Sequence, residues 1–563
     1  MLLLAVGFVA AGWLSVQRLN MLWDEARDLE IAMALVDDPL FGIGDDGSQM
    51  RLPMYVNAAV LTITGESLAV TRAISLAVGA ATIVLTYLLA REVFGAAAGV
   101  LAAALLATSP YFLAFGRIGM TEGDVFAAAG MTLAMLAFVR YLRRPDARRL
   151  AWCGLCLALA LGAKLYALAL LPAFAAVLLF GRRDEQRATG APPSRGYQQI
   201  GHLLAAGVIC VATVYLSWRG WRSAAVSAWL VALALWAATF LSLVLTRDRL
   251  VGWRAWVLIA LLGGVGLAVL MPTHVLCWQI ARDVLHRGRT WDGAAPLTGA
   301  ADHLRLYAGV LWIKLTPGVG ALATLGLLWG AWRARRDRAV AAMMLSMVLF
   351  VAGILVLPLQ QTFYLMSVVP LLFVVTAGMV VTAVRRMPLG RRARAIVAAT
   401  VLAGLFVHVG WEMRRCWPDV NLYGWHWVGT RWLGAESRGY RNLVNTPCDG
   451  TDDLIDWCRR HVEPGQTVVS YLWADHVIDR RIGDVDFTLI RRNARALGDV
   501  MGPPIDTADY LLLHVNNRVF YGDAPAPEQI ARFYDPTPAF TVFRDDGFEM
   551  AWVYRGPAVD RGR

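Results

Sequence analysis

Residues 68–90 of the chain read LAVTRAISLAVGAATIVLTYLLA, an apolar run of the length that a helix needs to cross a bilayer. The whole chain has 563 residues, of which 58% are hydrophobic and only 17% are charged. Soluble domains are close to half apolar and a quarter charged. Both the run and the composition therefore predict a membrane protein.

Similar runs recur along most of the chain, and we predict a mostly α, polytopic bundle of about 13 transmembrane helices. The candidate spans lie at about 1–17, 68–90, 95–113, 124–142, 149–163, 165–181, 200–218, 224–245, 253–273, 308–332, 339–358, 363–384 and 394–412.

Arginines gather in alternate loops between these runs, which indicates the orientation because cytoplasmic loops carry an excess of basic residues. The outer face then receives residues 18–67, 114–123 and 274–307. Basic residues in such loops also contact anionic lipid, so the net charge of +11 does not indicate a nucleic-acid partner. The loops assigned to the cytoplasm hold Arg91, Arg140, Arg143, Arg144, Arg148, Arg149, Arg182, Arg183, Arg187, Arg247, Arg249, Arg333, Arg335, Arg336, Arg338, Arg385, Arg386, Arg391, Arg392 and Arg394.

The tail from 413 to 563 is polar, and its apolar runs are short and rich in β-branched or aromatic residues. Strands alternating with helices predict a small α/β domain. We therefore expect two domains: 1–412 in the plasma or inner membrane, and 413–563 as an extracytoplasmic α/β domain. The predicted strands are Thr467–Leu472, Tyr510–Val515, Phe540–Phe543 and Met550–Tyr554, with helix-like segments at Asp452–Val462 and Glu528–Phe533.

Acidic residues follow the first span, in the stretch LWDEARDLEIAMAL at 22–35. This stretch predicts a short amphipathic helix against the membrane, with Asp24 and Glu25 at its start. Carboxylates at the mouth of a membrane bundle are costly to hold, which favours a functional role. Capping is the alternative, because a helix N-terminus tolerates negative charge. The same loop ends in QMRLPMYV, where Arg51 either binds a phosphate or anchors the chain at the interface.

A second charged cluster follows the third span, in SPYFLAFGRIGMTEGD at 109–124. Arg117, Glu122 and Asp124 make a candidate half-site there, and helix capping is the alternative for the acids. Lys164 lies between two apolar runs, where it is costly unless it pairs with an anion or reaches the interface. The outer loop 274–307 is also basic, as an anion-binding loop or a solvated loop would be. Its bases are His274, Arg282, His286, Arg287, Arg289, His303 and Arg305.

Five stretches occur in an order that resembles the membrane-embedded glycosyltransferases of the GT-C type. The similarity is greatest to the branch with protein O-mannosyltransferases and the lipid A aminoarabinose transferase. It covers about the first 185 residues, and QQTFYLMSVVPLL at 360–372 resembles a late span of that family. The five stretches are LWDEA, RLPMY, RAISLAVGAATIVLTYLLAREVFG, SPYFLAFGRIGMTEGD and ALGAKLYALALLP.

The resemblance implies an enzyme that moves a sugar from a polyprenyl phosphate to a protein, lipid or glycan acceptor outside the cytoplasm. It implies that Asp24 is the acid at the catalytic centre, with Glu25 beside it. Arg51 matches the basic residue that the family places before a proline. Glu122 or Asp124 would be the acid of the second outer loop.

The chain departs from the family pattern at two places. Met50 stands where the aminoarabinose branch has a glutamate. Gln360 and Gln361 precede Tyr364, where the family often has a basic residue. The identity of the sugar therefore does not follow from the resemblance.

The chemistry of such a transfer fits these residues. A sugar phosphate already carries a good leaving group, so the site needs a carboxylate to accept the proton of the acceptor hydroxyl and cations to hold the departing phosphate. We assign the proton to Asp24, and a single displacement then predicts inversion at the anomeric carbon. The candidate phosphate-binding residues are Arg51, Lys164, Arg117, Arg282 and His286, and the candidate substrate-binding residues are Tyr55 and Tyr364.

Three alternatives stay open. A divalent cation (Mg, Mn or Ca) held by Asp24 and by Glu122 or Asp124 would suit the preference of hard cations for oxygen. A secondary transporter would need intramembrane charges or broken helices in two repeated halves, and the sequence has no such repeat. A non-catalytic scaffold that displays the tail would not explain paired acids facing basic loops.

Overall fold

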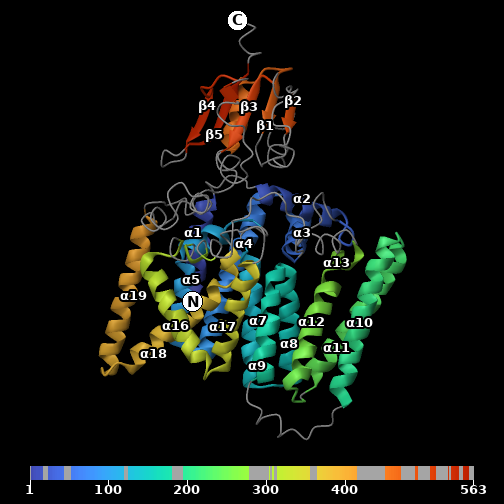
Figure 1. Ribbon diagram of the computed structural model, residues 1–563, viewed down its shortest axis with the longest axis vertical. Coiled ribbons are helices and arrows are strands. Elements are labelled where there is room, and N and C mark those ends of the chain that lie inside the picture. The colour runs from blue at the N-terminus through green and yellow to red at the C-terminus, as the bar shows by residue number, and fades with distance from the viewer. Residues whose placement is uncertain are drawn as a thin grey trace.

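The computed structural model describes residues 2–16, 23–42, 52–119, 124–180, 194–246, 248–277, 304, 307–309, 314–355, 364–414, 451–470, 488–491, 508–514, 530–531, 534–543 and 549–556. Helices make up most of this part of the chain, and a small sheet lies near the C-terminus (Figure 1). The prediction of a mostly α protein with a small sheet is confirmed.

The helices follow one another in the order expected from the apolar runs. Their bounds are α1 (Leu2–Val16), α2 (Trp23–Asp37), α3 (Leu52–Thr64), α4 (Leu68–Phe94), α5 (Ala96–Ala107), α6 (Pro110–Gly116), α7 (Val125–Arg143), α8 (Ala147–Ala163), the 3₁₀ helix η1 (Leu165–Ala169), α9 (Leu170–Phe180), α10 (Ser194–Trp218), α11 (Arg222–Leu245), α12 (Gly252–Leu270), α13 (Thr273–Leu276), α16 (Pro317–Ala334), α17 (Arg338–Leu355), the 3₁₀ helix η3 (Tyr364–Ser367), α18 (Val369–Arg386), α19 (Arg391–Met413) and α22 (Thr451–His461).

Seven helices in the described residues are long and apolar enough to cross a membrane. The bent pair α5–α6 would make an eighth, and the two helices meet at 62°. The bend falls at Pro110, because a proline disfavours helical backbone in the residue before it. Ser109 then caps α6 by accepting a hydrogen bond from the N–H of Phe112 at 3.3 Å. The chain is thus built as a multi-pass membrane protein, and the total of about thirteen spans stays a prediction.

The helices α7 and α8 form an antiparallel hairpin inside the bundle. Small residues let the two backbones approach closely: a Cβ on Gly130 would lie only 2.8 Å from the Cα of Ala160. The ring of Phe138 stacks on that of Phe174 in α9, with centroids 3.8 Å apart. The hairpin fixes which charged residues meet at each of its ends.

The sheet has five strands in the order β2-β1-β3-β5-β4. The strand β1 pairs in parallel with β2 and β3, whereas β5 pairs antiparallel with β3 and β4. Four of the strands lie where the sequence predicts them, and β2 is an addition. Their bounds are β1 (Thr467–Ser470), β2 (Thr488–Arg491), β3 (Tyr510–His514), β4 (Phe540–Phe543) and β5 (Glu549–Arg555).

The helices α2 and α3 lie between the long helices and the sheet (Figure 1). One cluster of buried apolar residues contains Leu29 and Ile31 of α2, Met54 of α3, and Leu454 and Trp457 of α22. The helices α2 and α3 and the C-terminal segment therefore share a core. Whether residues 413–563 form a separate extracytoplasmic domain stays a prediction.

Candidate functional site

The first acidic pair lies at the start of α2. This helix begins at Trp23, so Asp24 and Glu25 fall in its first turn, where unpaired N–H groups favour negative charge. The side chain of Asp24 lies outside the described part of the structure. The side chain of Glu25 is described, and it is fully buried.

Both carboxylate oxygens of Glu25 are engaged. Arg72 of α4 donates from Nε to Oε1 at 2.8 Å and from Nη2 to Oε2 at 2.5 Å. Such a bidentate pair is among the stronger hydrogen-bonded contacts in proteins. The Oε1 atom also accepts the backbone N–H of Gly119 at 2.6 Å. These contacts tie α2 to α4 and to the segment before α7, and the predicted place of Glu25 at the catalytic centre stays a prediction.

At Gly119 the backbone lies very close to the side chains of Thr71 and Glu25. A Cβ at this position would lie 2.9 Å from Oγ1 of Thr71 and 3.1 Å from Oε1 of Glu25. Both distances are shorter than ordinary carbon–oxygen contacts. Glycine at 119 therefore lets the backbone N–H reach the carboxylate.

Arg117 is buried, with 1% of its surface exposed. Its Nη1 donates to the carbonyl oxygen of Ser15 at 2.8 Å and also to the Ser15 hydroxyl, and its Nε donates to the carbonyl oxygen of Ala114 at 3.4 Å. Ser15 lies in the last turn of α1, where carbonyl groups lack helical partners. Arg117 thus fastens the end of α1 to the segment after α6, and its binding to phosphate stays a prediction.

The α7–α8 hairpin brings Asp124 and Lys164 together. Asp124 precedes α7 and Lys164 follows α8, and the Nζ of Lys164 lies 3.0 Å from Oδ1 of Asp124. Asp124 is 1% exposed, whereas the Lys164 side chain is 13% exposed. No described residue donates a hydrogen bond to Oδ2 of Asp124. The lysine therefore has the anion that its position requires, and the carboxylate keeps one open oxygen within the described part of the chain.

The backbone of Asp124 is left-handed, with φ 51°, the one positive φ at a non-glycine position among the described residues. Aspartate tolerates this conformation better than most residues, and such outliers gather at functional sites. Burial raises the pKa of Asp124, which lies just outside the α7 span, to about 6, and Lys164 acts in the opposite direction. The fold thus holds Asp124 in a position where both its backbone conformation and the burial of its carboxyl group cost free energy.

Aromatic side chains surround the Asp124–Lys164 pair. The Nζ of Lys164 lies 5.8 Å from the ring centroid of Tyr166, and that ring lies 5.0 Å from the ring of Tyr364. Tyr364 is buried, and both Tyr364 and Tyr111 lie close enough to Asp124 to interact with its charge. Of the predicted site residues, the structure therefore brings Asp124, Lys164 and Tyr364 into one cluster.

Tyr55 of α3 lies where the segment after α2 meets α13. Its hydroxyl oxygen lies 3.2 Å from the carbonyl oxygen of Pro39 and 3.2 Å from Oγ1 of Thr273, and it accepts the N–H of Thr273 at 3.3 Å. Tyr55 thus links the segment after α2 to α13. Its predicted contact with substrate stays a prediction. The predicted residues Arg51, Glu122, Arg282 and His286 lie outside the described residues.

The predicted divalent-cation site is only partly described. Within the described ranges, no group of three or more His, Cys, Asp or Glu side chains could hold a metal ion. The Asp124 carboxylate lies beside an ammonium group, and Mg²⁺ and Ca²⁺ take about six or more oxygen ligands. The described residues therefore do not form such a site by themselves.

Two buried cations, Arg72 and Lys314, are not among the site residues predicted from the sequence. Arg72 lies inside the apolar run 68–90. Its position in the sequence could have predicted a buried partner, because a cation within a membrane span is costly without one. Lys314 is 2% exposed and lies just before α16, inside the predicted span 308–332. Ionisable residues inside predicted spans are therefore as good candidates for site residues as acids in loops.

Residues 51–190, about a quarter of the chain, match the family model described as dolichyl-phosphate-mannose-protein mannosyltransferase. The predicted resemblance to GT-C membrane glycosyltransferases is confirmed. The matched segment contains Arg72, Gly119, Asp124 and Lys164, and thus most of the described cluster. No curated protein matches the chain.

Several solved structures are similar to this chain at low identity. One is the archaeal oligosaccharyltransferase AglB from Archaeoglobus fulgidus in complex with an inhibitory peptide and a dolichol-phosphate, with 13% identity, a TM-score of 0.49, and coverage of 99% of this chain and 74% of that chain. Another structure of the A. fulgidus oligosaccharyltransferase, in complex with Zn and sulfate, has 13% identity, a TM-score of 0.49, and coverage of 98% and 73%. ArnT from Cupriavidus metallidurans bound to undecaprenyl phosphate has 14% identity, a TM-score of 0.46, and coverage of 98% and 97%. Similarities at this level do not establish a function.

Proposed function

We propose that this chain is an integral membrane glycosyltransferase that moves a sugar from a polyprenyl-phosphate donor to an acceptor outside the cytoplasm. The observation that carries the proposal is the buried Asp124–Lys164 pair, which lies within the segment that matches the mannosyltransferase family model. A partly exposed cation held in place by a buried carboxylate suits a reaction that releases a phosphate, and the proton of that reaction is assigned to Asp24.

The transfer needs one proton acceptor and no strong acid. The oxygen of the acceptor hydroxyl attacks the anomeric carbon and forms the new C–O bond, while its proton passes to the carboxylate of Asp24. The bond between the anomeric carbon and the phosphate oxygen breaks, and its electron pair stays on the phosphate. The products are the glycosylated acceptor, with inverted configuration, and the polyprenyl phosphate.

Of the proposed phosphate-binding cations, Lys164 and Arg117 lie in the described part of the chain, and Lys164 is the more exposed of the two. Its ammonium group is held by Asp124 and remains partly exposed, so it can stabilise charge that develops on the departing phosphate. Arg51, Arg282 and His286 are proposed as further cations on the same outer face. Glu25 holds α2 in place and so positions Asp24.

An apolar groove of about 630 Å³ suits the prenyl tail of the donor. It is lined by Phe8 of α1, Leu113 of α6 and Val409 of α19, among other residues. The ring of Phe8 lies 5.3 Å from that of Phe112, also in α6. Because α6 ends next to Arg117, a tail in this groove would bring its phosphate towards the segment before Asp124.

We further propose that the N-terminus is cytoplasmic and that residues 413–563 form an extracytoplasmic α/β domain. The arginine-rich loops support this orientation. A reporter that is active only in the cytoplasm, fused to the C-terminus, should stay inactive. An active reporter would overturn the topology and leave the transfer reaction itself open to test.

The function is tested by mass spectrometry of cell-envelope glycans and of polyprenyl-phosphate sugars. Cells with the wild-type protein should carry a sugar that is absent from the envelope of cells without it, and cells without it should accumulate the donor. A secondary transporter would move an intact solute and leave the donor pool unchanged. Identical glycans and donor pools in both strains would contradict the proposal.

A further inference from the structure

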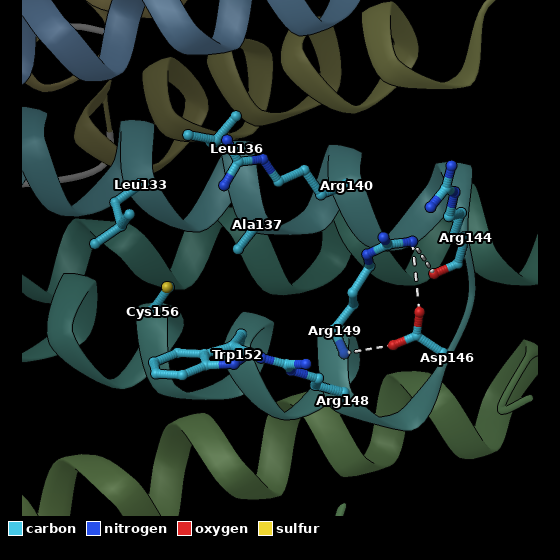
Figure 2. Close-up of a pocket in the computed structure, with 10 residues that line it drawn as sticks. All are labelled: Leu133, Leu136, Ala137, Arg140, Arg144, Asp146, Arg148, Arg149, Trp152 and Cys156. Carbon is cyan, nitrogen blue, oxygen red and sulfur yellow. Dashed lines mark hydrogen bonds and ion pairs between the residues drawn. The ribbon is translucent and has the colours of Figure 1, made fainter. Parts of the chain in front are cut away.

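A basic groove of about 790 Å³ extends from the middle of the α7–α8 hairpin to its turn, which is the end away from the Asp124–Lys164 pair. Figure 2 shows the residues that line it. The helix α7 has 19 residues and rises 1.5 Å per residue, so the two ends are roughly 28 Å apart. This distance is close to the thickness of the hydrocarbon core of a bilayer. The groove and the candidate site therefore face opposite surfaces of the membrane.

Four arginines line the groove together with a single acid, Asp146. Two of them have partners: the Nη1 of Arg149 lies 3.4 Å from Oδ2 of Asp146, and the Nε of Arg140 lies 4.0 Å from a carboxylate oxygen of Glu92. The other two, Arg144 and Arg148, are exposed, and no described residue forms an ion pair with either side chain. Two positive charges at the mouth of the groove are thus left for an external anion.

The turn that carries these arginines is held firmly. Asp146 caps α8 by accepting the N–H of Arg149 at 2.8 Å. The N–H of Leu250 donates to the carbonyl oxygen of Pro145 at 3.3 Å, and the hydroxyl of Tyr141 donates to the carbonyl oxygen of Leu250. The turn is therefore fixed against the segment before α12. Because the backbone of the turn is already fixed, a ligand that binds there orders little additional backbone.

The part of the groove nearer the middle of α7 is apolar. Leu133 and Leu136 of α7 and Trp152 of α8 line it (Figure 2). Trp152 is 45% exposed, and its ring packs edge-on against Phe240, with centroids 5.6 Å apart. Tryptophan rings gather at the level of lipid headgroups. The basic mouth and the apolar wall thus match the two parts of a phospholipid.

We propose that this groove is a binding site for an anionic phospholipid. Its phosphate lies at the α7–α8 turn, where the exposed Arg144 and Arg148 attract it, and its acyl chain lies along Leu133 and Leu136. Basic pockets between transmembrane helices bind anionic headgroups in this way. The site is distinct from the sugar-donor site, since the two lie at opposite ends of the hairpin.

The test is native mass spectrometry of the purified full chain in detergent, titrated with phosphatidylglycerol or with phosphatidylcholine. The double variant Arg144→Gln/Arg148→Gln should bind phosphatidylglycerol roughly 30-fold more weakly, because each basic side chain near the surface contributes about a fivefold gain. Binding of phosphatidylcholine should not change. The matched control is Arg335→Gln/Arg336→Gln, which removes the same charge from exposed residues at the end of α16, and it should bind phosphatidylglycerol like the wild type.

Three results would overturn the proposal. An equal loss of phosphatidylglycerol binding in both double variants would mean that the lipid binds to exposed arginines in general and not to this groove. Equal binding of the two lipids by the wild type would remove the charge preference. Release of bound phosphatidylglycerol by excess inorganic phosphate would identify a site for free phosphate instead of a lipid.

Discussion

Two buried acids of the candidate site, Glu25 and Asp124, are held in opposite ways. Among the described residues, Arg72 donates two hydrogen bonds to Glu25 and Gly119 donates one, and Glu25 lies in an ordinary helix. Asp124 has an ion pair with Lys164, one oxygen without a described hydrogen-bond donor, and a left-handed backbone. The difference teaches that burial alone does not identify a reactive carboxylate. The open oxygen of Asp124 and the partly exposed ammonium group of Lys164 make this pair a better candidate for contact with substrate than the Glu25–Arg72 pair.

The largest effect is expected at Asp24, next to the engaged Glu25. Asp24→Asn keeps the size of the side chain but removes the base, so turnover of a polyprenyl-phosphate sugar in nanodiscs should fall by about 10²–10⁴-fold. Asp37→Asn, at the exposed end of the same helix, is the matched control and should turn over donor like the wild type. Near-normal turnover in Asp24→Asn would show that Asp24 is not the general base and would leave Asp124 and Glu122 as the next candidates.

A loss of about 10²-fold in turnover is expected for Lys164→Met, because the departing phosphate loses a stabilising cation. The variant also leaves Asp124 buried without its counter-ion, which costs about 3–5 kcal/mol of stability and raises the pKa of the Asp124 carboxyl further. The double variant Asp124→Asn/Lys164→Met removes both charges and should recover stability but not turnover. Recovery of turnover in the double variant would make the pair purely structural.

A similar loss of stability but a smaller loss of turnover is expected for Glu25→Gln. This change leaves the buried Arg72 without its counter-ion, so the free energy of unfolding should fall by about 3–5 kcal/mol. Turnover per folded molecule should fall by less than the roughly 10²-fold loss typical of a missing general base. Thermal unfolding in detergent, measured beside turnover, separates the two effects. A turnover loss as large as that of Asp24→Asn would break the distinction between the two kinds of acid.

The smallest effect is expected for Gly119→Ala. The added Cβ would meet Thr71 and Glu25 at 2.9 and 3.1 Å, and overpacking of this kind typically costs about 1–3 kcal/mol. Gly264→Ala in α12 is the control, since a Cβ there meets nothing within 4 Å. The melting temperature should drop only in the first variant. Equal melting temperatures would show that the contact between Gly119 and Glu25 is not tight.

Much of the fold can be predicted because spans and strands leave local patterns. The run at 68–90 becomes α4, Leu68–Phe94, and the run at 467–472 becomes β1, Thr467–Ser470. The run at 95–113 shows the limit, since it becomes two helices that meet at 62°. Hydropathy records how apolar a segment is and not its direction. The short strand β2, Thr488–Arg491, gives no clear pattern and is missed.

The site is less predictable, because its contacts join residues that are distant in sequence. The position of Lys164 predicts a need for an anion, but only the hairpin geometry identifies Asp124 as that anion. The position of Arg117 favours a phosphate ligand, whereas its described hydrogen bonds include contacts to Ser15 at the end of α1. A cation in a loop looks the same in sequence whether it meets a ligand or a carbonyl group.

The central claim is that this chain transfers a sugar from a polyprenyl-phosphate donor with inversion. It is tested most directly by incubating the full chain in nanodiscs with a panel of polyprenyl-phosphate sugars and a cell-envelope extract as the acceptor source. Mass spectrometry would follow the donor, and nuclear magnetic resonance would give the anomeric configuration of the product. We expect release of polyprenyl phosphate and a product of inverted configuration, both absent with Asp24→Asn. Donors that stay intact with the folded wild-type chain would contradict the account.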